Sequence, residues 1–198
     1  MCFSWSIQAE GNIEGVIELP KPRGGTAASQ RYKADKALPP PPPLAAVWIE
    51  GDFGDSKASG KTASLPQKGF QFERSLLVVQ AGTAVTFPNH DEDYHSVFSY
   101  SKTREFDLGR YRKSEKPPEI VFDTPGEVKL YCEIHEHMRA TILVLETPYF
   151  AVTDPEGKFR IEGVPDGEHV LKYKLGRKIH ERKVSISSGQ TSKLNLGR

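Results

Sequence analysis

The residues with the clearest chemical potential lie in the segment Gly126–Met138, which reads GEVKLYCEIHEHM. Cys132, His135 and Met138 follow the spacing Cys-x2-His-x2-Met, so one short loop carries a thiolate, an imidazole and a thioether. Apolar residues alternate before Cys132, which predicts a strand that ends at the cysteine. A soft thiolate, a nitrogen donor and a weak axial sulfur suit copper, and a second histidine in the plane completes the trigonal donor set of a redox-active copper site.

The second histidine has to come from elsewhere in the chain. The segment Phe87–Ser99, FPNHDEDYHSVFS, places His95 directly before a short apolar strand and after a polar loop that Asn89 opens. A β-sandwich can bring such a histidine to the end of the sheet where the Cys-His-Met loop closes. We therefore expect His95, Cys132, His135 and Met138 to form one metal site.

These motifs resemble a known family. Pro125–Met138 resembles the copper loop of plastocyanin and amicyanin, with Gly-Glu-x-x-x-Tyr-Cys-x-x-His leading in, and the short loop spacing resembles amicyanin most. The wider run, FPNHD…HSVFS, FDLGRY and CEIHEHMRA, is similar to bacterial proteins of the methylamine utilization protein-like or plastocyanin-like kind. The resemblance covers about Leu65–Glu146.

The resemblance implies a cupredoxin Greek-key β-sandwich that binds one type 1 (blue) copper per chain. It implies that His95, Cys132 and His135 are equatorial ligands and that Met138 is the axial ligand. In the family, the exposed edge of the loop histidine, here His135, serves as the electron port. The implied function is one-electron transfer between redox partner proteins.

Two polar residues are expected to support the ligands without binding the metal, namely Asn89 and Ser96. Plastocyanin-type sequences usually have Asn directly after the first histidine ligand, where this chain has Ser96. That position helps to tie the two ligand loops together. Serine keeps a polar side chain there, but a shorter one.

Other uses of these loops stay open. Carboxylates crowd them, and with the histidines they could build a zinc or type 2 copper site instead; the residues concerned are Asp91, Glu92, Asp93, Glu133, Glu136, His90, His95, His135 and His137. Met138 could be core packing only, and His90 and His137 are off the ligand pattern and expected at the solvent side. A copper-binding or storage module without electron transfer is the rival function, and a structural adhesion or carbohydrate-contact protein is a third.

The composition excludes several other classes. Lys and Arg number 27 against 26 Asp and Glu, so no basic excess favours a nucleic-acid partner. No window of eighteen apolar residues predicts a transmembrane span, and the N-terminus shows no signal peptide. A copper–thiolate site nevertheless favours a compartment outside the reducing cytosol, so we expect a periplasmic or envelope location. No nucleophile–base pair is evident, and we expect an electron carrier and not an enzyme.

The predicted fold class is all-β. Fifteen Pro and seventeen Gly separate short runs of alternating apolar residues, which indicates β-sandwiches. The expected strands are Ile13–Leu19, Ala46–Glu50, Ser75–Val79, Thr83–Phe87, Val97–Tyr100, Ile120–Phe122, Val128–Cys132, Thr141–Leu145, Lys158–Ile161, His169–Leu175, Lys183–Ser187 and Ser192–Leu196.

Two domains are expected. The C-terminal stretch VTDPEGKFRIEGVPDGEHVLKYKL resembles the carboxypeptidase regulatory-like (transthyretin-like) sandwich, whose opening strands resemble GNIEGVIEL and AAVWIEG near the N-terminus. We therefore predict a smaller, prealbumin-like sandwich split into 11–51 and 147–198, with the copper-binding domain, 65–146, inserted. Tandem domains with an N-terminal arm are the alternative. A Pro-rich connector, 21–45, is expected to be extended, and Gly51–Gln67 is expected to be a surface loop.

Overall fold

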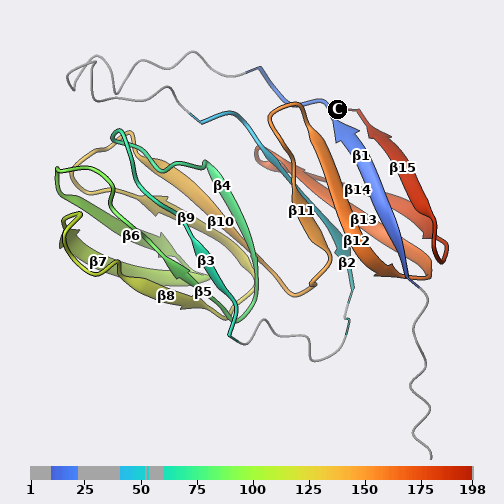
Figure 1. Ribbon diagram of the computed structural model, residues 1–198, viewed down its shortest axis with the longest axis horizontal. Helices are drawn as coiled ribbons and strands as arrows, with labels where there is room; N and C mark the ends of the chain where they lie inside the picture. The colour runs from blue at the N-terminus through green and yellow to red at the C-terminus, as the bar shows by residue number, and fades with distance from the viewer. Residues whose placement is uncertain (1–9, 22–40, 52, 54–59, 198) are drawn as a thin grey trace, which may run out of the picture. The chain divides into compact units, whose positions relative to one another are not determined.

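The computed structural model describes residues 10–21, 41–51, 53 and 60–197 of the chain. Every regular element among these residues is a β-strand, which confirms the predicted all-β class (Figure 1). The strands are β1 Glu10–Ile17, β2 Ala45–Glu50, β3 Thr62–Ser64, β4 Leu76–Gln80, β5 Thr83–Thr86, β6 His95–Ser101, β7 Arg104–Tyr111, β8 Glu119–Phe122, β9 Gly126–Tyr131, β10 Arg139–Leu145, β11 Phe150–Val152, β12 Lys158–Pro165, β13 Gly167–Leu175, β14 Lys178–Ile186 and β15 Thr191–Leu196.

The strands separate into two compact units. One unit takes the described residues of Met1–Leu19, Leu44–Phe53 and Tyr149–Arg198, and the other those of Pro20–Pro43 and Gly54–Pro148. We call them the split unit and the central unit. Each unit contains two sheets and its own buried core, so each is a β-sandwich.

The central unit pairs a five-stranded sheet, in the order β4-β10-β9-β6-β7, with a three-stranded sheet, β3-β5-β8. Inward-facing side chains from both sheets form one core, which includes Val85 and Phe122 from the smaller sheet and Val97, Leu130 and Ile142 from the larger one. Cys132 and Met138 belong to the same buried cluster. Two of the four candidate metal ligands therefore belong to this core.

The split unit pairs a sheet in the order β12-β1-β15 with a sheet in the order β11-β2-β13-β14. β1 is antiparallel to β12 and parallel to β15, while β2 lies between β11 and β13. Two N-terminal strands are thus interior strands of sheets that the C-terminal segment otherwise builds. A turn at Gly157 precedes β12, with φ of +85° and a hydrogen bond from the Gly157 N–H to the Asp154 carbonyl.

The structure corrects several expected elements. β3, β7 and β11 were not predicted, and β14 starts five residues before the predicted strand. β3 lies in the predicted surface loop Gly51–Gln67, and Leu65 and Gln67 are fully buried, so that prediction is wrong for its last residues. β7 and β14 are edge strands with many exposed charges, and such strands give a weak apolar pattern.

Some sequence predictions concern residues outside the described part. They include most of the Pro-rich connector 21–45, whose last residue, Ala45, begins β2 and is fully buried. Within the described ranges, no helix is long and apolar enough to span a bilayer.

Candidate metal centre

Neighbouring strands of the central unit bring the predicted ligands together. His95 is the first residue of β6, and Cys132 directly follows β9. β6 and β9 are antiparallel, with Phe98 opposite Tyr131. The first residue of β6 and the last residue of β9 therefore lie at the same end of the sheet. His135 lies in the loop that leads from β9 to β10.

The donor atoms of three predicted ligands converge. Nδ1 of His95 lies 3.0 Å from Nδ1 of His135, and Sγ of Cys132 lies 3.8 Å from the same His135 nitrogen. The donor atoms of all three residues lie within 4.8 Å of one another. All three side chains are buried: His95 is 0%, Cys132 3% and His135 4% exposed.

These separations fit a single metal ion. Two imidazole nitrogens that bind one ion at about 2.0 Å each lie roughly 3 to 3.5 Å apart. A thiolate sulfur binds at about 2.3 Å, so its distance to either nitrogen is longer by a few tenths of an ångström. Within the part of the chain that the structure describes, no carboxylate joins this group. The donor set is therefore one sulfur and two nitrogens, which are soft and borderline ligands.

Asp91 fixes the orientation of the His95 ring. Its carboxylate lies 2.9 Å from Nε2 of His95, and it also accepts hydrogen bonds from the backbone N–H groups of Gly69 at 2.8 Å and Phe70 at 3.0 Å. Burial opposes the charge on Asp91, but these three donors outweigh it and lower its pKa to about 2. Because the ionised carboxylate only accepts, Nε2 of His95 carries a hydrogen, and Nδ1 faces the other donor atoms of the group.

The environment of Cys132 favours its thiolate. Burial by itself raises the pKa of a thiol, but hydrogen bonds from His135, His95 and the backbone N–H of Ser96 lower the pKa of Cys132 to about 5. Burial by itself lowers the pKa of His95, but Asp91 and the Cys132 sulfur raise it by more. The pKa of His95 is therefore above its ordinary value. The metal-free site thus stabilises the negative sulfur that binds a metal ion.

Ser96 and Asn89 connect the ligand segments. The hydroxyl of Ser96 accepts a hydrogen bond of 3.1 Å from the backbone N–H of Glu133, which directly follows Cys132. Asn89 donates to the backbone carbonyls of Asp93 and Tyr111 and accepts from the N–H of Asp91. Asn89 therefore shapes the loop that ends at His95, and Ser96 joins that segment to the cysteine loop.

Met138 ends the ligand loop inside the core. Its backbone N–H donates to the His135 carbonyl at 2.9 Å, which closes a turn, and its side chain is 1% exposed. The turn keeps Met138 on the same loop as His135. Its role as axial ligand remains a prediction.

The expected exposed edge of His135 is not found. The ring of Phe70 lies over it, with ring centroids 5.0 Å apart, and the ring of His137 lies 6.3 Å away. His137 is itself half-buried, and its Nε2 donates to the Phe70 carbonyl at 2.7 Å, so the solvent-side prediction is wrong for His137. For His90 it is correct, since that side chain is 47% exposed beside Glu73.

The other carboxylates near the loops have different partners. Glu133 makes a two-pronged ion pair with Arg110, and Glu92 pairs with Lys113 at 2.8 Å. The sequence suggested Asp91 only as an alternative ligand. Its position four residues before His95 was the signal for its supporting role, whereas the sequence around Phe70 held no signal for the cover over His135.

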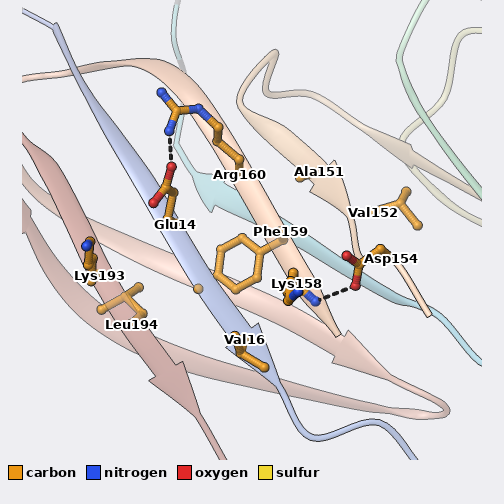
Figure 2. Close-up of a pocket in the computed structure, with 11 residues that line it drawn as sticks. Glu14, Val16, Ala151, Val152, Asp154, Lys158, Phe159, Arg160, Lys193 and Leu194 are labelled. Atoms are coloured by element: carbon orange, nitrogen blue, oxygen red, sulfur yellow. Dashed lines mark hydrogen bonds and ion pairs between the residues drawn. The ribbon is translucent and has the colours of Figure 1, made fainter. Parts of the chain in front are cut away.

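A groove lies on the split unit. It is an open groove of about 650 Å³ whose floor includes Phe159, packed across Gly15 (Figure 2). Its rim carries the ion pair of Glu14 with Arg160, and Lys158 and Lys193 also line it. The groove contains no thiol or imidazole and bears no relation to the metal chemistry.

Comparisons with known proteins give distant matches only. No family model matches the chain, and no curated protein matches it. Among solved structures, a reduced amicyanin with a tryptophan-to-tyrosine substitution is 18% identical, with a TM-score of 0.40, and the match covers 50% of this chain and 98% of that one. A reduced proline-to-phenylalanine variant of amicyanin is 21% identical, with a TM-score of 0.39 and the same coverage of both chains. The reduced Cu(I) form at pH 4 of a third amicyanin variant is 20% identical, again with a TM-score of 0.39 over 50% and 98% of the two chains. A likeness this distant carries no inference about function.

Proposed function

We propose that this chain is an electron carrier that binds one copper ion at His95, Cys132 and His135, with Met138 as a weak axial ligand. One observation carries the proposal: the buried thiol of Cys132 and the imidazole nitrogens of His135 and of His95, which lies 40 residues before His135 in sequence, converge within 4.8 Å. Two histidines and a cysteine with a long axial methionine form the donor set of copper sites that transfer electrons.

The surroundings favour copper over a site of hard oxygen ligands. Asp91 is engaged by His95 and by two backbone N–H groups, and Glu133 is engaged by Arg110. A carboxylate-rich zinc site needs such oxygens at the metal, and a site of nitrogen and oxygen ligands is typical of type 2 copper. The carboxylates here instead orient a ligand or form ion pairs at the surface.

Each protein group has a defined task in electron transfer. Asp91 orients His95, the backbone N–H of Ser96 stabilises the Cys132 thiolate, and burial excludes water from the donors. Ligands that are already held in place need little rearrangement when the charge of the site changes. The bound copper supplies the one-electron couple between Cu(II) and Cu(I).

The carrier function requires two kinds of partner. A reduced protein donates one electron, and an oxidised protein accepts that electron, so no bond is made or broken and no substrate is converted. The proposed role is therefore that of a carrier and not of an enzyme. A compartment outside the reducing cytosol, such as the periplasm, suits a thiolate-bound copper.

A copper-holding module without electron transfer is the second candidate, and the burial of His135 favours it. Cyclic voltammetry and electron self-exchange measured by NMR distinguish the two. A reversible one-electron wave with fast exchange supports the carrier. Stable copper binding without reversible reduction supports the holding module.

Copper titration of the metal-free protein tests the site. We expect the native chain to bind one equivalent of Cu(II), and the Cys132→Ser and His95→Ala variants to lose that stoichiometric binding. His90→Ala is the matched control, because His90 is an exposed histidine of the same loop. Unchanged binding and an unchanged spectrum in Cys132→Ser would exclude the proposed ligands.

A further inference from the structure

A tight turn of the central unit lies beside the metal ligands and has no assigned role. It runs from Lys68 to Gln71 and is closed by a hydrogen bond of 2.9 Å from the Lys68 N–H to the Gln71 carbonyl. Gln67, just before the turn, donates to the Pro88 carbonyl and accepts from the N–H of His90, both at 2.9 Å. The turn is therefore attached to the loop that leads to His95.

Phe70 occupies an unfavourable backbone conformation in this turn. Its φ is +59°, and that of Gly69 is +62°, so both central residues lie in the left-handed region. Phe70 is the single non-glycine residue in the described ranges with a positive φ. Glycine or asparagine fits such a position, whereas a bulky aromatic residue there indicates strain that the surroundings must maintain.

Two residues from the ligand loops maintain this conformation. The carboxylate of Asp91 accepts the N–H groups of both Gly69 and Phe70, and Nε2 of His137 donates to the Phe70 carbonyl. Asp91 precedes His95 by four residues, and His137 follows His135 by two. The turn is thus fixed on both sides by the segments that carry the histidine ligands.

The strained backbone directs the Phe70 ring onto those ligands. Its centroid lies 5.0 Å from that of His135, at an interplanar angle of 66°, and 6.2 Å from that of His95. Phe70 is 5% exposed, and the His135 ring that it covers is 4% exposed. The aromatic cover accounts for the missing exposed edge of His135.

We propose that Phe70 is a shield that keeps water and small Lewis bases, such as azide, away from the His95–Cys132–His135 donors. Asp91 and His137 are the positioning residues of this shield. The consequence for a bound metal rests on the proposed copper site, but the shielding of His135 does not. A shielded site excludes added ligands, which distinguishes it from a centre that binds substrate.

Histidine footprinting of the full-length, metal-free protein tests the shield. Diethyl pyrocarbonate modifies accessible neutral imidazoles, and peptide mass spectrometry reports the rate at each histidine. We expect His90 to react in the native protein and His135 to be protected. In Phe70→Gly, His135 should react at least about tenfold faster, since the covering ring is absent and no local opening is needed.

Two further substitutions of Phe70 serve as controls for this footprinting experiment. Glycine is unstrained at positive φ, so Phe70→Gly should keep the turn, and Phe70→Asn provides a second variant that tolerates the same backbone. Phe70→Tyr keeps the ring and should keep His135 protected. Equal protection of His135 in native and Phe70→Gly proteins, with His90 reacting equally in both, would overturn the shield.

The positioning residues are tested by the same footprint. His137→Ala and Asp91→Ala remove hydrogen bonds to Phe70, so each should raise the rate at His135 and speed amide exchange at Phe70. A merely structural role would lower the free energy of unfolding without this local change. Unaltered rates at both sites would refute the role of Asp91 and His137.

An experiment on the copper-loaded protein tests the shield separately from the proposed function. Azide should leave the visible spectrum of the native copper protein unchanged and should alter that of Phe70→Gly. A protein that binds no stoichiometric copper, yet shows the footprint difference, refutes the copper carrier and supports the shield. A copper protein whose Phe70→Gly variant resists both azide and footprinting refutes the shield alone.

Discussion

Ser96 Oγ accepts a hydrogen bond of 3.1 Å from the backbone N–H of Glu133, across 37 residues of sequence. Ser96 follows the proposed ligand His95 and Glu133 follows the proposed ligand Cys132, so this one bond joins the two segments that supply the donor atoms. The backbone N–H of Ser96 also lowers the pKa of the Cys132 thiol. A serine therefore connects the ligand loops at the position where plastocyanin-type sequences usually have asparagine.

The Ser96→Ala variant tests this connection. Loss of the bond should lower the free energy of unfolding of the metal-free protein by about 1 kcal/mol, measured by urea denaturation. It should also speed copper release to a chelator. Ser101→Ala is the control, because Ser101 Oγ accepts a comparable bond of 2.9 Å from the Lys129 N–H away from the ligands. Equal copper release from both variants would show that the Ser96 bond does not steady the site.

Met138→Leu tests the axial ligand. Leucine has nearly the same volume, so this substitution in the core should cost less than about 1.5 kcal/mol of stability. The variant should still bind one copper through the three other ligands, but with a raised reduction potential, because a donor that favours Cu(II) is removed. Voltammetry gives the potential. An unaltered potential would mean that Met138 only packs the core.

The buried phenol of Tyr111 should make the free energy of unfolding depend on pH in the alkaline range. Its hydroxyl donates to the Phe87 carbonyl and accepts from Gln67, and burial raises the pKa of this phenol above its ordinary range. The unfolded chain loses the phenol proton near pH 10, while the folded chain keeps it. The contribution of Tyr111 to the free energy of unfolding is therefore complete below about pH 10 and is lost as the pH rises further.

The Tyr111→Phe variant isolates that contribution. Its free energy of unfolding should be lower than native at neutral pH but should fall less steeply above about pH 10. Urea denaturation at a series of pH values measures both slopes. Tyr100→Phe is the control, since Tyr100 is 77% exposed. Parallel slopes in native and Tyr111→Phe proteins would contradict the assignment.

The split domain is tested by deletion. We propose that 11–51 and 147–198 form one folding unit with 65–146 inserted, because β1 and β2 lie inside sheets built from C-terminal strands. Deleting residues 1–52 should then abolish amide-exchange protection in β12–β15, while a fragment of residues 60–148 should still bind copper. Native-like protection of β12–β15 after the deletion would favour tandem domains.

Local patterns in the sequence predicted much of the fold and the residues whose donor atoms lie close together. The alternation before Cys132 predicted β9, and the spacing from Cys132 to His135 predicted the loop that brings these donors together. Short exposed strands were harder to predict. β7 has charged residues on its exposed face and lies at a sheet edge, so packing gives it little apolar signature.

The cover of His135 could not be predicted, because it depends on tertiary contacts. Nothing near Phe70 indicates a positive φ at an aromatic residue, and the two side chains that bind its backbone, Asp91 and His137, lie at least 21 residues away in sequence. Asp91 had a local signal in its spacing from His95. Its bonds to Gly69 and Phe70 became evident only with the fold.

The most direct test of the central claim is the absorption and EPR spectrum of the protein loaded with one equivalent of Cu(II). A thiolate and two imidazoles around copper predict an intense visible charge-transfer band and a narrow copper hyperfine splitting, and both should disappear in Cys132→Ser. A nearly colourless protein with the wide splitting of a type 2 site would contradict the proposed ligands and, with them, the proposed electron carrier.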